Sequence, residues 1–97
     1  MSAFVVAQIQ INDPEQYKKY IEGFYPSFER HGGTVLATTK SSTEVIEGEW
    51  SYPHTVILQF PDVDAAHAWH SDPEYVELAK IRQNSAHTNL AIVDGIS

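Results

Sequence analysis

The stretch AFVVAQIQINDPEQYKKY, residues 3–20, contains two patterns that together decide the fold. Residues 3–11 alternate with a period of two, as in a strand with one dry face and one mixed face. Asp13 followed by Pro14 is typical of a helix start, because Asp caps the free N–H groups and proline fits the first helical position. The stretch therefore predicts a strand followed directly by a helix. The apolar face of the strand consists of Val5, Ala7, Ile9 and Ile11.

Apolar residues at helical spacing extend this helix toward residue 28 and indicate a face that packs on the core. Pro26 is expected to kink or divide the helix, because proline removes a backbone donor. His31-Gly32-Gly33 predicts its end, with Gly32 free to adopt a left-handed conformation. The residues of the stripe are Tyr17, Tyr20, Ile21, Phe24, Tyr25 and Phe28.

The rest of the chain continues the alternation of strands and helices. Strands are predicted over residues 34–39, 44–47, 54–60 and 87–93, where the first two are either consecutive strands or one bent strand. Helices are predicted after Asp62, running to about residue 70, and after Asp72-Pro73. This order predicts one α+β domain over residues 1–97, a plait with helices on one face of an antiparallel sheet. The other face mixes Val6 and Ile57 with glutamines, so we expect two copies to pack sheet to sheet as a homodimer.

Composition excludes several classes of protein. The formal net charge is −7 with six Lys and Arg residues, which disfavours nucleic acid and anionic membranes as partners. The chain has no cysteine, which excludes disulfides and a Cys nucleophile. The N-terminus lacks the pattern of a signal peptide, so a cytoplasmic protein is expected. No dinucleotide or phosphate-binding motif occurs, and no cofactor is expected.

Five motifs along the chain resemble one known family: NDPEQYKKY (12–20), HGGTVLA (31–37), VIEGEW (45–50), VILQFPD (56–62) and SDPEYVELAKIRQNSA (71–86). This family is domain of unknown function 1330, within the dimeric α/β barrel superfamily. The resemblance implies a ferredoxin-like subunit and a homodimer whose sheets form a barrel. The superfamily includes cofactor-free monooxygenases, lactone isomerases, haem enzymes and binding proteins. The sequence departs from the family pattern at His54, His70 and Lys40-Ser41-Ser42, where Arg, Tyr and Arg-Gly-Gly are usual.

A candidate ligand site is expected between the sheet and the last two helices. His54 and His70 are the candidate acid or base, since imidazole titrates near neutral pH. Trp69 and Tyr75 are candidate ligand-binding residues, and the alternative is that both simply fill the core. Trp50 lies in a turn beside Pro53, which suggests that it packs on a partner subunit or covers a pocket mouth.

Other charged and titratable groups give weaker indications of a functional site. His67 and His70 are three apart on a predicted helix, but no metal-binding motif supports them, so no metal is expected. Glu74 and Arg82 are too far apart for a direct pair, and each is expected in solvent or at the subunit interface.

The leading hypothesis is a homodimer that binds a small apolar or aromatic molecule, with cofactor-independent oxidation or isomerisation possible. The alternative is a non-catalytic structural or interaction dimer.

Overall fold

A computed structural model describes residues 2–96 and contains four strands and four helices in the predicted order. The strands are β1 (Ala3–Ile11), β2 (Thr34–Ala37), β3 (His54–Phe60) and β4 (Ala86–Asp94). The helices are α1 (Pro14–Glu22), α2 (Tyr25–Arg30), α3 (Val63–Ser71) and α4 (Pro73–Ser85). Within residues 2–96, no helix is both long enough and apolar enough to cross a lipid bilayer.

The helix boundaries follow the local chemistry that the sequence indicates. The carboxylates of Asp13, Asp62 and Asp72 accept hydrogen bonds from backbone N–H groups in the first turns of α1, α3 and α4. The first long helix is divided as expected, with Pro26 in the first turn of α2, where its missing N–H costs no intrahelical bond. Gly32 has a φ of 79°, which glycine adopts without strain.

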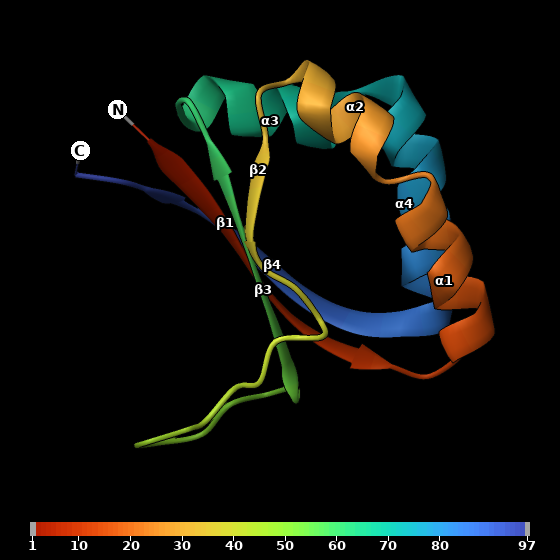
Figure 1. Cartoon of the computed structure of the whole chain (residues 1–97), viewed down its shortest axis with the longest axis vertical. Coiled ribbons are helices and arrows are strands. Elements are labelled where there is room, and N and C mark those ends of the chain that lie inside the picture. Colours follow the sequence, from red (N-terminus) through yellow and green to blue (C-terminus); the bar gives the residue numbers. More distant parts are fainter. Residues whose placement is uncertain (1, 97) are drawn as a thin grey trace.

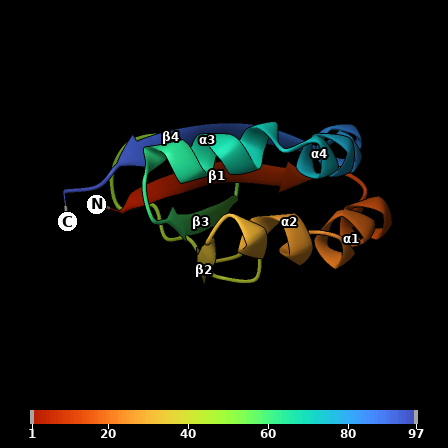
Figure 2. The same cartoon turned by 90° about the horizontal axis from the view of Figure 1, so that it is seen from above.

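The sheet has the strand order β2-β3-β1-β4, and all three neighbouring pairs are antiparallel. Figures 1 and 2 show the helices on one face of this sheet, with α3 and α4 over the β4 side and α1 and α2 over the β2 side. The fold is therefore the predicted α+β, ferredoxin-like plait. Its two central strands are β3 and β1.

The core lies between the sheet and the helices and is rich in aromatic rings. Phe28, Phe60, Trp69 and Tyr75 are each only 1% exposed. Trp69 is central, with its ring centroid 5.3 Å from that of Phe60 and 4.2 Å from that of Tyr75. Such contacts fix the angle between α3 and α4, because both aromatic residues come from the ends of these helices.

The expected strand over residues 44–47 is wrong. Residues 42–52 contain no strand, and the loop between β2 and β3 projects beyond the sheet on the side opposite the helices (Figure 1). Val45 and Ile46 are 46% and 81% exposed, so their β-propensity has no neighbouring strand to act on. β2 also ends at Ala37 rather than at residue 39, after an irregularity in its pairing with β3.

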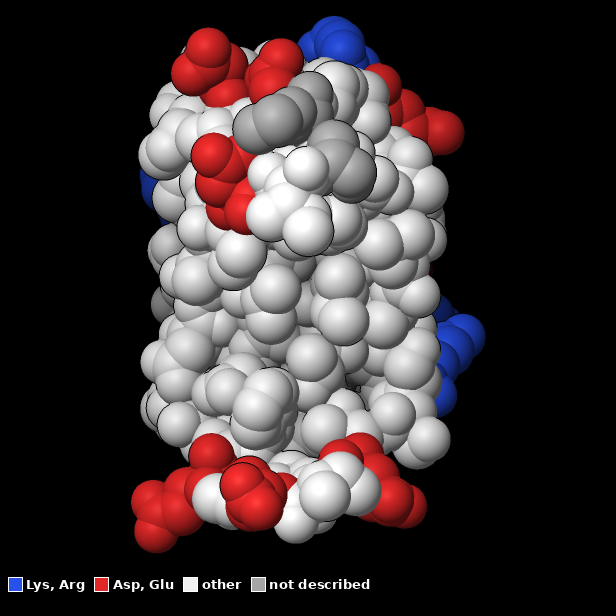
Figure 3. Space-filling view, turned by 90° about the vertical axis from the view of Figure 1, so that its left-hand side faces the viewer, with Lys and Arg blue, Asp and Glu red and all other residues white. Residues whose placement is uncertain are grey.

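The face of the sheet opposite the helices carries partly exposed apolar side chains. Val6 pairs with Ile57 on one side and Ala91 on the other, and Phe4 pairs with Val93, so these side chains share this face. Val93 is 47% exposed. Figure 3 shows this side of the molecule, where acidic residues gather at the two ends, basic residues lie at the edges, and the centre of the face carries no charged residue.

Candidate functional site

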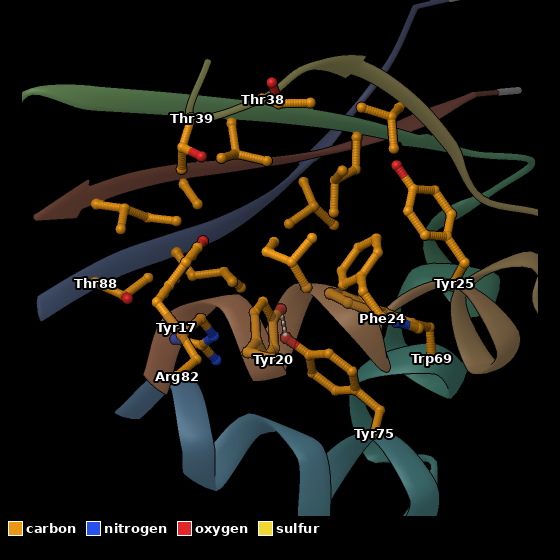
Figure 4. A pocket seen from close by; sticks show the side chains of 18 of the residues that line it. Tyr17, Tyr20, Phe24, Tyr25, Thr38, Thr39, Trp69, Tyr75, Arg82 and Thr88 are labelled. Carbon is orange, nitrogen blue, oxygen red and sulfur yellow. Dashed lines mark hydrogen bonds between the residues drawn. The ribbon is translucent and has the colours of Figure 1, made fainter. Parts of the chain in front are cut away.

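A cavity of about 330 Å³ lies between the sheet and the helical layer. Its walls are mostly apolar and come from β1, β3 and β4 on one side and from α1 and α4 on the other (Figure 4). This volume is at the lower end of the range for small-molecule sites in proteins. The apolar lining residues include Val5, Ala7, Ile9, Phe24, Val56, Leu58, Trp69 and Leu90.

The helical wall of the cavity carries a cluster of phenols around a buried cation. The hydroxyl oxygens of Tyr20 and Tyr75 lie 2.8 Å apart and share a hydrogen bond. Arg82 is 6% exposed, and its guanidinium carbon is 5.8 Å from the centre of the Tyr20 ring. Arg82 lies in the last turn of α4, where the helix dipole favours a positive charge.

Burial raises the pKa values of Tyr17 and Tyr20 further above neutral pH. Removal from solvent raises the pKa of Tyr17 to about 12, although the nearby charge of Arg82 acts in the opposite direction. Burial also raises the pKa of Tyr20 well above its ordinary value, and the neighbouring Tyr75 adds to this effect. The hydroxyl groups of Tyr17 and Tyr20 therefore act as neutral hydrogen-bonding groups and do not neutralise Arg82.

Several polar atoms of the cavity lining have no hydrogen-bond partner. Within residues 2–96, the buried side-chain atoms of this kind are Ser27 Oγ, Trp69 Nε1, Arg82 Nε and Thr88 Oγ1. All except the Ser27 hydroxyl belong to residues that line the cavity. Each of these three lining groups can donate a hydrogen bond, and native proteins rarely leave such groups unpaired. The unpaired donors make this cavity the site most suited to a polar group of a ligand.

The more exposed lining residues mark the mouth of the cavity. Ile21 and Tyr25, from the α1–α2 region, line the cavity and are 42% and 46% exposed. The segment that follows β2 contributes Thr38, Thr39 and Lys40. Figure 4 shows Thr38 and Thr39 on the strand side and Tyr25 at the end away from Arg82. Lys40 is the exposed cation among the lining residues.

The predicted site residues are divided between this cavity and other parts of the molecule. Trp69 and Tyr75 line the cavity, as expected of a pocket wall, although both also belong to the aromatic core. His54, at the start of β3, and His70, on α3, are not among the lining residues within the described part of the chain. Trp50 lies in the projecting loop, where its Nε1 donates a hydrogen bond to Thr55 Oγ1 at 3.1 Å.

The expectation that Arg82 lies in solvent or at an interface is wrong, because its side chain is buried in the cavity wall. Glu74 is exposed and pairs with Arg30 at 3.3 Å instead. A signal for Arg82 was present in the sequence. Tyr75, Ala79 and Arg82 are spaced by four and three, which places them on one helical face, and all three are buried.

A second cluster of charged side chains joins α2 to the start of α4. Asp72 accepts hydrogen bonds from Arg30 at 2.7 Å, from the backbone N–H of Glu74 at 2.9 Å, and contacts His31 Nε2 at 2.8 Å. The hydrogen bond from Arg30, followed by that from His31, holds the pKa of Asp72 well below its ordinary value. Every charged group in this cluster has a partner, so its role is structural.

The described residues contain no group of three or more His, Asp or Glu side chains that could hold a metal ion. His67 and His70 therefore have no third ligand close by in residues 2–96. Both lie along a separate, shallow depression between α3 and β4 that also includes Asp94. The cavity around Arg82 remains the candidate site.

Comparison with solved structures supports the fold. The chain is similar to a protein of unknown function from Rhodopseudomonas palustris, with 23% identity over 99% of this chain and 83% of that one and a TM-score of 0.77. It is similar to SnoaB, a cofactor-independent oxygenase from Streptomyces nogalater, with 11% identity over 99% and 94% of the two chains and a TM-score of 0.65. A dimeric ferredoxin-like protein of unknown function from Jannaschia sp. CCS1 gives 8% identity over 98% and 100%, and a TM-score of 0.67. Identities this low establish the fold alone.

The family match is more specific than these structural likenesses. None of the curated proteins matches the sequence significantly. The profile of the family described as domain of unknown function (DUF1330) matches residues 2–96, which is nearly the whole chain and confirms the resemblance that its motifs indicate. The chain therefore belongs to the DUF1330 family.

Proposed function

We propose that the protein binds a small, largely apolar molecule in the cavity between its sheet and its helices, as one subunit of a homodimer. The observation that carries the proposal is the cavity itself. An apolar chamber of about 330 Å³ with a few polar groups in its lining has the character of a small-molecule site. A core built only for stability would instead pack to high density and leave few unpaired polar atoms.

A variant that fills the cavity tests the binding proposal. Leu90 and Ile92 lie two residues apart on β4 and share a face, but only Leu90 lines the cavity. We expect Leu90→Trp to abolish the rise in Tm that small aromatic and branched compounds produce in the wild type, whereas Ile92→Trp retains it. Equal responses from the two variants would refute binding at this site.

The homodimer part of the proposal rests on the open face of the sheet. Partly exposed apolar side chains line this face, and the loop carrying Val45, Ile46 and Trp50 projects from the same side. A protein with a similar fold, from Jannaschia sp. CCS1, is dimeric. Contiguous apolar surface of this kind usually marks an interface between proteins.

Two valines of nearly equal exposure provide a matched test of the dimer. Val93 on the open face is 47% exposed, and Val76 on α4 is 45% exposed. We expect Val93→Glu to lower the molar mass measured by light scattering from that of a dimer to that of a monomer, because a charge would be buried in the interface. Val76→Glu should remain dimeric. A wild-type monomer at micromolar concentration would overturn this part of the proposal.

Cofactor-independent oxidation or isomerisation is the second candidate function. SnoaB, which has a similar fold, is a cofactor-independent oxygenase. His54 and His70 are the proposed acid or base, but no His, Asp or Glu is among the residues lining the cavity, so the geometry favours binding over turnover. Loss of turnover in His54→Asn or His70→Asn with an intact dimer would support catalysis. Unchanged behaviour in every substrate assay would support a non-catalytic dimer.

A further inference from the structure

The charge of the cavity is opposite to the charge of the protein. The chain has 13 Asp and Glu residues against six Lys and Arg residues. The residues that line the cavity include two cations, Arg82 inside and Lys40 at the mouth, and no carboxylate. A random sample of this acidic chain would contain more acids than bases. The cavity therefore concentrates positive charge in a protein that otherwise repels anions.

Arg82 is a buried cation without an acidic partner. It takes part in none of the ion pairs formed within residues 2–96. Its neighbours are phenols, and the hydroxyl groups of Tyr17 and Tyr20, whose pKa values burial raises above the ordinary value, carry no negative charge at pH 7. A buried charge without an opposite charge is costly to keep away from water, and neutral phenols offset only part of that cost. The cost is removed when an anion binds beside it.

The remaining polar atoms of the lining favour the same kind of ligand. Arg82 Nε and Trp69 Nε1 are donors only, and Thr88 Oγ1 can donate. A ligand oxygen beside Arg82 would accept hydrogen bonds from Arg82 and from Thr88, which lie at the same end of the cavity, whereas Trp69 lies toward the other end (Figure 4). A guanidinium also binds carboxylates with particular geometric selectivity, through two parallel N–H groups.

We infer that the ligand of this cavity is a small organic monocarboxylate with an aromatic or branched apolar body, held by Arg82. This inference rests on the proposed binding function and names its ligand class. The carboxylate lies beside Arg82, Tyr20 and Tyr75, and the apolar body lies between the sheet and the Phe24–Trp69 wall. Lys40 attracts the anion to the mouth. The volume of about 330 Å³ limits the ligand to a molecule of about one ring with a short chain.

Pairs of acids and their neutral amides test the inference by calorimetry and by the shift in Tm. The probes are 3-phenylpropanoate with 3-phenylpropanamide, and 3-methylbutanoate with 3-methylbutanamide. We expect each acid to bind about 10- to 100-fold more tightly than its amide, as charge-assisted hydrogen bonds allow. Arg82→Met should remove this difference by weakening the acid far more than the amide, whereas Arg82→Lys should retain part of it.

Lys80→Met is the matched control, because Lys80 is an exposed cation on the same helix and pairs with Glu77. It should leave both affinities unchanged, which separates a contact with Arg82 from the general effect of charge. Amides that bind the wild type as tightly as the acids would overturn the carboxylate inference and leave the cavity proposal intact. If no acid and no amide raises the Tm at millimolar concentration, both the inference and the proposed binding function are wrong.

Discussion

Arg30 and Arg82 differ both in exposure and in their partners. The exposed arginine has carboxylate partners, whereas the buried arginine has none in the described part of the chain. The Arg30 side chain is 51% exposed and contacts two carboxylates, those of Asp72 and Glu74. Arg82 is 6% exposed and has phenols as neighbours in place of carboxylates. Water would solvate the exposed guanidinium of Arg30 even without a carboxylate partner. The buried guanidinium of Arg82 has little water around it and therefore needs such a partner more. We infer that Arg30 stabilises the fold of the single chain, whereas Arg82 is available to an acidic partner that residues 2–96 do not supply.

The first test asks whether the phenols around Arg82 compensate its charge. Tyr20→Phe deletes one side of a buried 2.8 Å hydrogen bond and leaves the Tyr75 hydroxyl unpaired. We expect the free energy of unfolding to fall by about 2 kcal/mol in urea denaturation, within the range for a buried group that loses its partner. The loss should be smaller in an Arg82→Met background, where no charge needs the phenolic oxygen. An identical loss in both backgrounds would mean that the phenols do not compensate Arg82.

Arg82→Met is the second test, and its expected sign is opposite to that of most core substitutions. Replacing a buried charge by an apolar side chain often stabilises a protein. We expect the unliganded protein to gain about 1 kcal/mol, a modest gain within that range because Tyr20 and Tyr75 already offset part of the cost. Lys80→Met, on the exposed face of α4, should change stability by less than about 0.5 kcal/mol. A clear loss of stability in Arg82→Met would show that Arg82, like Arg30, serves the fold.

The fold itself was accessible from the sequence because its decisive signals are local. The side chains of Asp13, Asp62 and Asp72 cap backbone groups within three residues of themselves. The alternation of residues in β1 and β3 directly indicates which face of each strand packs on the core. The strand predicted over residues 44–47 failed because a strand needs a neighbour, and the projecting loop has none within residues 2–96. Local pattern cannot supply that information.

The candidate site was predicted less well, for a related reason. Trp69 and Tyr75 were expected in the pocket wall because aromatic side chains can hold a flat apolar ligand, and both line the cavity. Arg82 shares the helical face of Tyr75 on α4, but its position was predicted only from its distance to Glu74, which left it in solvent or at the interface. The distance of His54 and His70 from the cavity depends on how the helices rotate over the sheet, which no single segment encodes. The spacing of Tyr75, Ala79 and Arg82 was the better guide.

Acid denaturation tests the Arg30 side of the comparison. The folded pKa of Asp72 is lowered, first by the hydrogen bond from Arg30 and then by that from His31. A lowered folded pKa stabilises the protein above the unfolded pKa of about 3.8, and this stabilisation is lost as the pH falls below it. We expect the wild type to lose stability between pH 4 and pH 2, and Asp72→Asn to have a flatter acid limb and a lower Tm at pH 7. A parallel acid limb in both proteins would contradict the assignment to Asp72.

Arg30→Met is expected to have the smallest effect and completes the comparison. An exposed ion pair contributes little, because solvent screens the charges and the two side chains lose freedom when they pair. The Tm should fall slightly at low salt and be nearly unchanged at 1 M NaCl, opposite in sign to the effect of Arg82→Met at either salt concentration. Binding of 3-phenylpropanoate should be unaffected, since Arg30 does not line the cavity. If Arg30→Met instead weakened carboxylate binding as much as Arg82→Met does, the two arginines would not have separate roles, and the acid would be responding to the overall charge of the protein.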